Sequence, residues 1–405
     1  MLYDAYEMQR SMLAGASALA NFGAGLLQNP ANPFAYFGGG AIMGSALEVF
    51  AHASAPRGKP AFGLTKTIVD GREVVVHEEI LARKPFGQLK RFRREGVEDS
   101  PRLLIVAPMS GHYATLLRGT VERMLPTCEV YITDWRDAKL VPLSDGRFDF
   151  DDYVDYIIDF LTEIGPGAHM LAVCQPSVPC YVAACVMSAD KHPCTPRTLT
   201  LMGGPVDTRE APTSVNLLAT ERPHAWFEQN AIATVPMTYP GAGRRVYPGF
   251  LQLAGFMSMN LGNHMISHWE MFKHLVQGDG ESADSTKRFY DEYRSVCDMT
   301  AEFYLQTVEL VFQRHALPKG EMLHHGKRVD PGAISDIGLL AIEGERDDIS
   351  GLGQTRAALT LATNLPEEKK RYYMAEKVGH YGIFNGSKWR NQIAPVVEEW
   401  IKANA

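Results

Sequence analysis

Short apolar runs alternate with stretches of helical period through the middle of the chain. Each apolar run is too short for a helix and is followed by turn-forming residues, so it predicts a buried strand. These strands are expected at residues 103–107, 130–132, 169–173 and 199–202. Helices are expected between them at residues 114–124, 153–161 and 182–187. This alternation predicts a mostly parallel sheet with helices on both faces, whose ligands bind at the carboxyl ends of the strands.

A different pattern precedes this region. Two runs of period two, at residues 65–69 and 74–77, flank Asp70–Gly71 and predict a β-hairpin. A basic stretch follows at residues 83–94. We expect it to be a solvent-facing strand and turn, because a contact with an anionic surface usually needs a longer basic run.

The predicted organisation has four parts. They are an N-terminal accessory segment (1–60), the first part of a catalytic core (61–210), a cap or lid insertion (211–300) and the second part of the core (301–405). The insertion is predicted where the alternation ends, and a long helix at residues 289–312 is expected to lead back to the core. The N-terminal helix is expected to pack on the body, with a weak surface anchor as the alternative.

A cysteine at the end of a predicted strand is the first candidate for chemistry. Cys174 follows the run at 169–173, and Pro176 fits the first turn of a following helix. This is the shape of a nucleophile elbow, with Ala172 and Pro176 at the positions of the glycines in G-x-S-x-G. A strand-end cysteine is also common as a small buried apolar residue, so this segment by itself leaves both interpretations open.

Two downstream segments favour catalysis. The apolar run 339–344 leads into Asp347 and Asp348, and the run 371–376 leads into His380. The order nucleophile, acid, histidine is typical of α/β-hydrolases and predicts that fold. In such a fold the oxyanion hole would use the backbone N–H of Gln175 and one from the loop after the strand at 103–107, where Met109 and Ser110 are the candidates.

Composition adds few constraints. The 405 residues carry a formal net charge of −7, with 45% hydrophobic and 21% charged residues, which is ordinary for a folded globular protein and gives no reason to expect nucleic acid binding. Six cysteines without metal-ligand spacing indicate a reduced, cytoplasmic protein. No stretch has the apolar length of a transmembrane helix, and a homo-oligomer is compatible with the sequence.

Several further residues are candidates for substrate contact. An aromatic and methionine-rich insertion suits either an ordinary helical core or a lid over an apolar substrate. His264 and His268 share a helical face but lack the glutamate of a zinc-protease motif, so we expect no metal site. His112, after the strand at 103–107, could contact the substrate or be an ordinary loop histidine that hydrogen bonds within the protein. The candidates are His112, Trp226, Tyr239, Tyr247 and Phe250.

The chain resembles the intracellular polyhydroxybutyrate depolymerases. The resemblance covers nearly the entire chain and is carried by residues 174–176, 239–252, 300–308 and 378–382. It implies that Cys174 is the nucleophile, His380 the base and Asp347 the orienting acid. It further implies a cytoplasmic enzyme on polyhydroxybutyrate granules that requires no cofactor, with water or coenzyme A as the acyl acceptor.

Three alternatives remain open from the sequence. Polyhydroxyalkanoate synthases have a segment similar to Asp134–Arg136 and a cysteine nucleophile, but their G-x-C-x-G elbow is absent here. A small-molecule esterase or thioesterase would use the same triad. A granule-coating protein would keep the fold without the chemistry.

Overall fold

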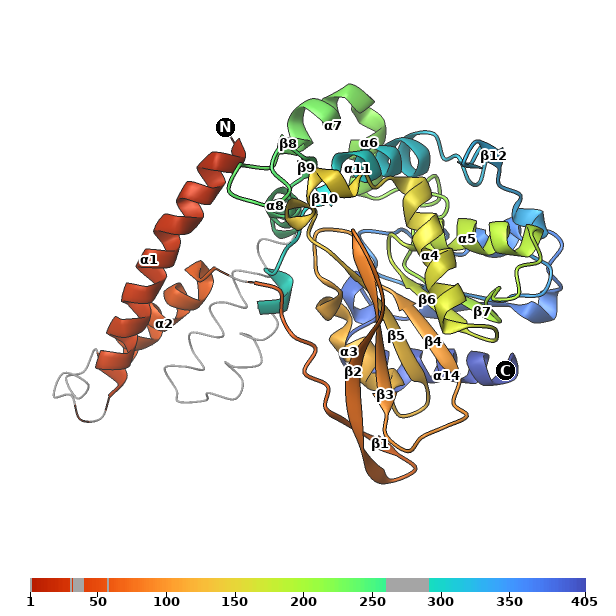
Figure 1. The fold of residues 1–405 in the computed structure, drawn as a ribbon, viewed down its shortest axis with the longest axis horizontal. Helices are drawn as coiled ribbons and strands as arrows, with labels where there is room; N and C mark the ends of the chain where they lie inside the picture. The colour runs from red at the N-terminus through yellow and green to blue at the C-terminus, as the bar shows by residue number, and fades with distance from the viewer. Residues whose placement is uncertain (1, 30, 32–39, 57, 260–290) are drawn as a thin grey trace.

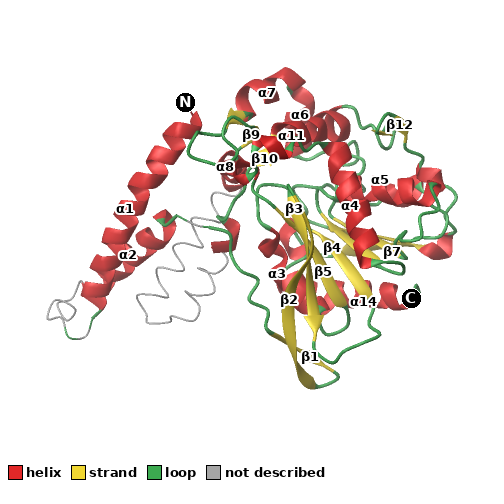
Figure 2. Cartoon of the chain, in the orientation of Figure 1, coloured by secondary structure: helices red, strands yellow, loops and turns green. Residues whose placement is uncertain are grey.

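The computed structural model describes residues 2–29, 31, 40–56, 58–259 and 291–405. A nine-stranded sheet with the order β1-β2-β3-β5-β4-β6-β7-β13-β14 forms its centre (Figures 1 and 2). The strands are β1 (Lys66–Val69), β2 (Arg72–Lys84), β3 (Gly87–Arg94), β4 (Arg102–Val106), β5 (Glu129–Trp135), β6 (His169–Val173), β7 (Thr198–Met202), β13 (Gly338–Gly344) and β14 (Lys370–Ala375). In this sheet β5, β4, β6, β7, β13 and β14 pair in parallel, whereas β1, β2 and β3 form an antiparallel edge.

Helices cover both faces of this sheet, as the alternating pattern predicts. One pair is α4 (Phe150–Ile164) and α5 (Ser177–Ala189), and the other is α3 (Arg118–Met124) and α14 (Ala394–Ala403). Helix α4 begins with a capping box, in which Asp149 and Asp152 exchange side-chain to backbone hydrogen bonds. Every residue of β6, β7 and β13 is buried, which explains why these strands are continuous apolar runs. The predicted fold class is confirmed.

The predicted hairpin is also confirmed. The basic stretch at 83–94 forms the end of β2, a turn and strand β3. Asp70 (φ 49°) and Gly71 (φ 77°) both have positive φ, as a two-residue hairpin turn requires. Most basic side chains on β2 and β3 pair at the surface, for example Arg93 with Glu79 at 2.7 Å. Arg94 departs from the prediction of a solvent-facing stretch, since it is buried and its Nη1 donates to the carbonyl of Leu125 at 2.9 Å.

The segment between β7 and β13 is less regular. A small sheet, β10-β9-β8, forms beside its helices. The elements are α6 (Ser214–Glu221), α7 (His224–Ala231), β8 (Ala233–Thr234), β9 (Arg245–Tyr247), α8 (Gly249–Met259), β10 (Met299–Thr300), α11 (Ala301–Thr307), β11 (Leu323–His324) and β12 (Lys327–Arg328). Two short helices, α12 (Ala357–Leu361) and α13 (Gly386–Lys388), lie further along the chain. The candidate metal ligands His264 and His268 lie outside the described residues.

The predicted long helix at 289–312 is interrupted: among the described residues, 291–293 are helical and the helix then stops. Residues 294–300 are not helical, and α11 begins at Ala301 before a π-helical turn to Gln313. Asp298 explains the interruption, because its carboxylate accepts the backbone N–H of Gly249 at 2.9 Å and its carbonyl accepts that of Ala138 at 3.0 Å. These contacts with distant segments outweigh the local helical preference.

Among the described residues, the N-terminal segment contacts the body near the start of α1 (Leu2–Gln28) and at His52 of α2 (Gly40–Ser54), whose Nε2 lies 3.0 Å from Asp291 Oδ1. The two helices pack against each other and extend away from the sheet (Figure 1). The expectation of a helix packed along the body is therefore wrong, apart from the first turns of α1. In the described part of the chain, no helix combines the length and apolar character needed to cross a membrane.

Candidate active site

Cys174 occupies a sharp turn between strand β6 and helix α5. Its φ of 68° lies in the left-handed region, where residues other than glycine are strained by about 1–3 kcal/mol. The turn is fixed at both ends: the N–H of Cys174 donates to the Met202 carbonyl at 2.7 Å, and the N–H of Ser177 donates to the Cys174 carbonyl at 3.0 Å. Cys174 directly follows the last residue of β6, so it lies at the carboxyl edge of the sheet, and it is half-buried there.

The close approach at this turn is made possible by glycines from the neighbouring strand. Gly203 and Gly204 follow β7, and a Cβ on Gly204 would overlap the Ser177 side chain. A Cβ on Gly203 would lie 3.2 Å from Asp347 Oδ2 and 3.3 Å from His380 Cε1. The sequence-based interpretation sought small residues beside the cysteine and missed this pair. The signal was present as two glycines directly after an apolar strand.

His380 and Asp347 form a hydrogen-bonded pair at the ends of β14 and β13. His380 Nδ1 donates to Asp347 Oδ2 at 2.7 Å, and the Asp347 side chain has no exposed area. The other oxygen, Oδ1, accepts the backbone N–H groups of Ile349 at 2.9 Å and Ser350 at 2.8 Å. These bonds fix the carboxylate in one orientation. The neighbouring Asp348 is exposed.

The electrostatics of His380 depend on two anionic partners. Burial lowers the pKa of the His380 imidazole, but the charges of Cys174 and Asp347, and hydrogen bonds to both side chains, raise that pKa well above its ordinary value. The two neighbouring side chains thus favour the protonated form of His380. The structure thus brings together three side chains from segments that are far apart in the sequence.

Glu343 is a buried carboxylate that the sequence-based interpretation missed. It lies on β13, and its Oε1 accepts the N–H groups of Gly353 at 3.0 Å, Thr355 at 2.8 Å and Arg356 at 2.9 Å. Thr355 Oγ1 in turn accepts the N–H of Gly204 at 2.8 Å. Glu343 therefore ties the loop that carries Asp347 to the turn beside Cys174. An acidic residue inside an otherwise apolar strand was the available signal.

The two predicted oxyanion donors lie next to each other. The N–H of Met109 donates to the side-chain Oε1 of Gln175 at 3.2 Å, so the loop after β4 and the residue after Cys174 are in direct contact. The loop begins from a fixed point, because the Ala107 carbonyl accepts Trp135 Nε1 at 2.7 Å. Ser110 is half-buried in a bend one residue further on.

The predicted substrate-contact residues are spread over several clusters. His112 is buried, with Nε2 2.9 Å from the Tyr293 carbonyl, and burial lowers its pKa to about 4. These contacts fit the alternative interpretation of His112 as a hydrogen-bonded loop residue. Tyr247 stacks on Tyr304, with ring centroids 4.0 Å apart. Trp226 contacts Phe227 edge to face.

The remaining two candidates contact the N-terminal helix. Phe250 stacks on Tyr6 with ring centroids 3.9 Å apart, and Tyr239 Oη accepts a hydrogen bond from Arg10 Nη2 at 3.2 Å. Among the described residues, the aromatic contacts of Tyr239, Tyr247 and Phe250 involve neither Cys174 nor His380. Tyr239 and Phe250 contact α1. They help to hold α1 on the body.

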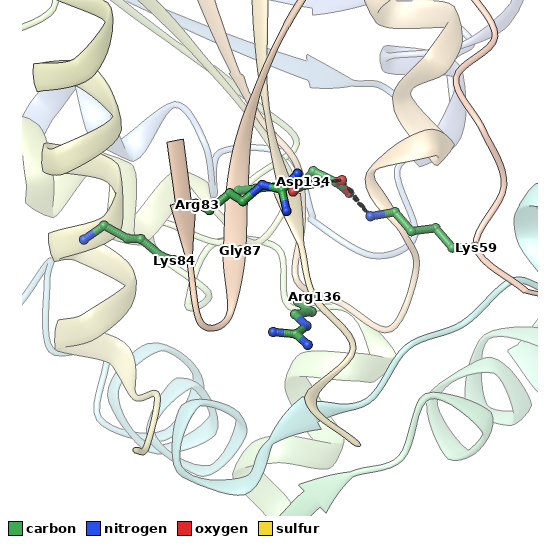
Figure 3. Close-up of a pocket in the computed structure, with 7 residues that line it drawn as sticks. Lys59, Arg83, Lys84, Gly87, Asp134 and Arg136 are labelled. Atoms are coloured by element: carbon green, nitrogen blue, oxygen red, sulfur yellow. Dashed lines mark hydrogen bonds and ion pairs between the residues drawn. The ribbon is translucent and has the colours of Figure 1, made fainter. Parts of the chain in front are cut away.

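A basic pocket of about 400 Å³ lies at the same carboxyl edge of the sheet, beside the β2–β3 turn (Figure 3). Several of its charged groups already have partners: Lys59 pairs with Asp134 at 2.5 Å, and Lys84 pairs with Asp159. Its lining contains none of the three clustered side chains. The lining residues are Lys59, Arg83, Lys84, Gly87, Gln88, Asp134 and Arg136.

One group in the described residues has the composition of a metal site. The side chains of Asp155, His324 and His325 offer ligand atoms within 4.8 Å of one another. Both imidazoles already hydrogen bond to the Asp155 carboxylate, at 2.9 Å and 2.7 Å. Because Asp155 lies on α4, this group is separate from the Cys174 cluster.

The sheet order, the strained turn after β6 and the acid and histidine after the last two strands define an α/β-hydrolase. Residues 203–405 match the family described as the PHB de-polymerase C-terminus, and the chain belongs to this family. It is a carboxylic ester hydrolase. The matched region contains Asp347 and His380 and begins after Cys174.

Solved structures also resemble the chain at low identity. One is the 2-hydroxy-6-oxo-6-phenylhexa-2,4-dienoate hydrolase from Rhodococcus sp. strain RHA1, with 12% identity, a TM-score of 0.45, and coverage of 81% of this chain and 99% of that chain. Another is the Paleococcus ferrophilus monoacylglycerol lipase, with 12% identity, a TM-score of 0.41, and coverage of 76% and 96%. No curated protein sequence matches the chain.

Proposed function

We propose that the protein is a depolymerase that cleaves the ester bonds of poly(3-hydroxybutyrate) through a cysteine acyl-enzyme. The observation that carries this proposal is the convergence of Cys174, His380 and Asp347 at the carboxyl edge of the sheet, in a chain of the depolymerase family. In this proposal Cys174 is the nucleophile, His380 the general acid and base, and Asp347 the group that orients the imidazole.

The first half-reaction forms a thioester. The Cys174 thiolate attacks an ester carbonyl carbon of the polymer, and the backbone N–H groups of Gln175 and Met109 stabilise the resulting oxyanion. The carbon–oxygen bond of the ester then breaks, and the departing alkoxide takes the proton of the His380 imidazolium. The raised pKa of His380 supports this step, because the protonated imidazole is the proton donor that the departing alkoxide needs.

The second half-reaction releases the acyl group. His380 takes a proton from water, the oxygen attacks the thioester carbonyl, and the Cys174 sulfur leaves as the thiolate. Coenzyme A would replace water in a thiolysis and yield the coenzyme A ester instead. In both cases Asp347 keeps the Nδ1 proton of His380 in place, so that Nε2 faces the reacting atoms.

Gln175 must change its contact for this cycle. Its side-chain Oε1 accepts the Met109 N–H at 3.2 Å, which is the donor that the oxyanion needs. In the proposed mechanism the substrate oxygen displaces this amide oxygen. The Met109 donor is thereby kept hydrogen-bonded while no substrate is bound, which avoids an unsatisfied buried N–H.

The test is release of 3-hydroxybutyrate from amorphous polyhydroxybutyrate granules by the intact chain, with and without coenzyme A. We expect release of monomer or oligomers, and a coenzyme A dependence would identify thiolysis. Polymer formation from 3-hydroxybutyryl-coenzyme A would instead identify a synthase-like acyltransferase. If only soluble short esters are cleaved, the protein is a small-molecule esterase, and if granules are bound without any release, it is a granule-coating protein.

The cellular setting belongs to the same proposal. A polymer of this kind is stored as granules in the cytoplasm, and six free cysteines fit a reducing compartment. The granule surface is accordingly the proposed partner of the enzyme.

A further inference from the structure

The N-terminal hairpin, defined as helix α1 (residues 2–28) and helix α2 (residues 40–54), exposes large apolar side chains and buries small ones. Large apolar residues are exposed on it: Met12 is 72% exposed, Leu19 74% and Phe22 68%. On α2, Ile42 is 53% exposed and Met43 58%. Helices that pack in water normally direct such residues at each other and expose polar ones.

The contact between the two helices is made mostly by small residues, and Leu47 of α2 lies over Gly23 of α1. Apart from Tyr3 at the anchored end, the residues of the two helices that are described as buried are Ser17, Ala20, Ala24, Gly40, Gly44, Ser45 and Ala51. Ser17 Oγ donates across the pair to the Ala51 carbonyl at 2.7 Å. Small residues between helices and large apolar residues outside are the arrangement of helix pairs surrounded by an apolar phase, where Leu gains nothing by turning inward.

The charges of the N-terminal hairpin indicate which kind of apolar phase it suits. Between Arg10 and Glu48 the sequence contains no Asp, Glu, Lys or Arg. Helices that lie on anionic membranes carry Lys and Arg on their polar face, and protein interfaces are enriched in Arg with a polar rim. A neutral, apolar polymer surface requires neither feature.

The anchor of the N-terminal hairpin connects it to the catalytic edge. Tyr3 Oη donates to Asp298 Oδ2 at 2.5 Å, beside the stacking of Tyr6 on Phe250. The residue before Asp298, Cys297, donates its N–H to the Gly111 carbonyl at 2.7 Å, in the loop that carries Met109. A surface that holds the hairpin is thus coupled through a few contacts to the proposed oxyanion loop.

We propose that the N-terminal hairpin is the docking element of the enzyme, and that its exposed apolar face inserts into the neutral polyester phase of its substrate. This inference rests on the proposed function for the identity of the polymer. Docking holds the catalytic edge at the polymer surface, so that successive ester bonds reach Cys174 without dissociation of the enzyme.

The test compares binding with catalysis on two substrates. The variant Met12→Gln/Leu19→Gln/Phe22→Gln changes only exposed positions of α1. Its matched control, Ile68→Gln/Val75→Gln/Ile80→Gln, removes three exposed apolar side chains from β1 and β2, which are 52%, 50% and 40% exposed. Binding is measured by sedimentation with detergent-free amorphous polyhydroxybutyrate granules, and catalysis on granules and on a soluble 3-hydroxybutyrate trimer.

We expect the α1 variant to bind granules about tenfold or more weakly, to lose granule hydrolysis in proportion, and to keep its rate on the trimer. The control variant should bind like the intact chain. Unchanged granule binding by the α1 variant overturns the proposal. So does a shift from dimer to monomer in analytical ultracentrifugation, since the face would then be a contact between copies, or equal binding of the intact chain to phosphatidylglycerol vesicles.

Failure of the proposed function has a separate signature. Binding is also measured with Cys174→Ala, which needs no turnover. If the intact chain and Cys174→Ala bind granules equally, and neither releases product, the docking inference stands and the depolymerase proposal falls.

Discussion

The central sheet and the N-terminal hairpin use the same apolar residue types in opposite ways. Leu171 on β6 is fully buried between the two helical layers, whereas Leu19 on α1 is 74% exposed. In the sheet, burial of large side chains supplies the stabilisation, and small residues occur where backbones must approach, as at Gly204. In the hairpin, small residues form most of the contact between the helices, and most of the large apolar ones are exposed. Apolar composition alone therefore does not distinguish a core from a docking surface.

The largest expected effect concerns the two cysteines near the turn after β6. Cys174→Ala should lower the rate on granules and on the soluble trimer by about 10⁵-fold or more, because it removes the nucleophile. Cys180, in α5, is its control: it is fully buried, and burial raises its pKa well above the ordinary thiol value. Cys180→Ala should keep the rate within a few fold. A Cys174→Ala variant that remains active would remove Cys174 from the mechanism.

The second prediction concerns the neighbouring acids. Asp347→Asn should lower kcat by about 10⁴-fold while the fold remains intact, because the imidazole loses the partner that fixes its orientation and charge. Asp348→Asn, at the exposed neighbour, should change kcat little. Since Asp347 raises the pKa of His380, the alkaline limb of the rate profile should move to lower pH in Asp347→Asn. An equal loss in both variants would contradict the assigned acid.

A third prediction tests the comparison between sheet and hairpin directly. Leu171→Ala should lower the free energy of unfolding by about 2–5 kcal/mol, because it leaves a cavity in the core. Leu19→Ala should change it by at most about 0.5 kcal/mol, because the side chain is exposed. Urea unfolding of both variants in the absence of granules measures this difference. A comparable cost at Leu19 would mean that this face is covered in solution.

The sheet was predictable because its strands are buried on both faces. A run such as residues 169–173 then contains only residues that prefer the interior, apart from His169, whose Nδ1 bonds to Thr198 Oγ1 at 2.9 Å. The order of nucleophile, acid and histidine along the chain predicted the cluster, and the family resemblance selected Asp347 over Asp348. Their chemical roles stay predictions until the variants are measured.

The features that were missed depend on contacts between distant segments. The glycines that the turn at Cys174 needs come from positions 203 and 204, in a neighbouring strand connection. The helix expected at 289–312 is interrupted by Asp298, whose partners include Tyr3 near the other end of the chain. For α1 the sequence left two interpretations open, a helix packed on the body and a weak surface anchor, because the apolar period of an exposed helical face is the same as that of a buried one.

The smallest expected effect distinguishes two glycines within the N-terminal hairpin. Gly25 has no atom within 4 Å of the position a Cβ would take, whereas at Gly23 that position is 3.1 Å from Leu47 Cδ1 on α2. Gly25→Ala should stabilise α1 by up to about 1 kcal/mol, because alanine loses less entropy in a helix interior. Gly23→Ala should gain less, since the Leu47 side chain must move. Hydrogen exchange of the α1 amides should therefore slow by up to about fivefold in Gly25→Ala and by less in Gly23→Ala. Equal protection in both variants would mean that α1 and α2 are apart in solution, and that the contact between small residues forms only when the hairpin is docked.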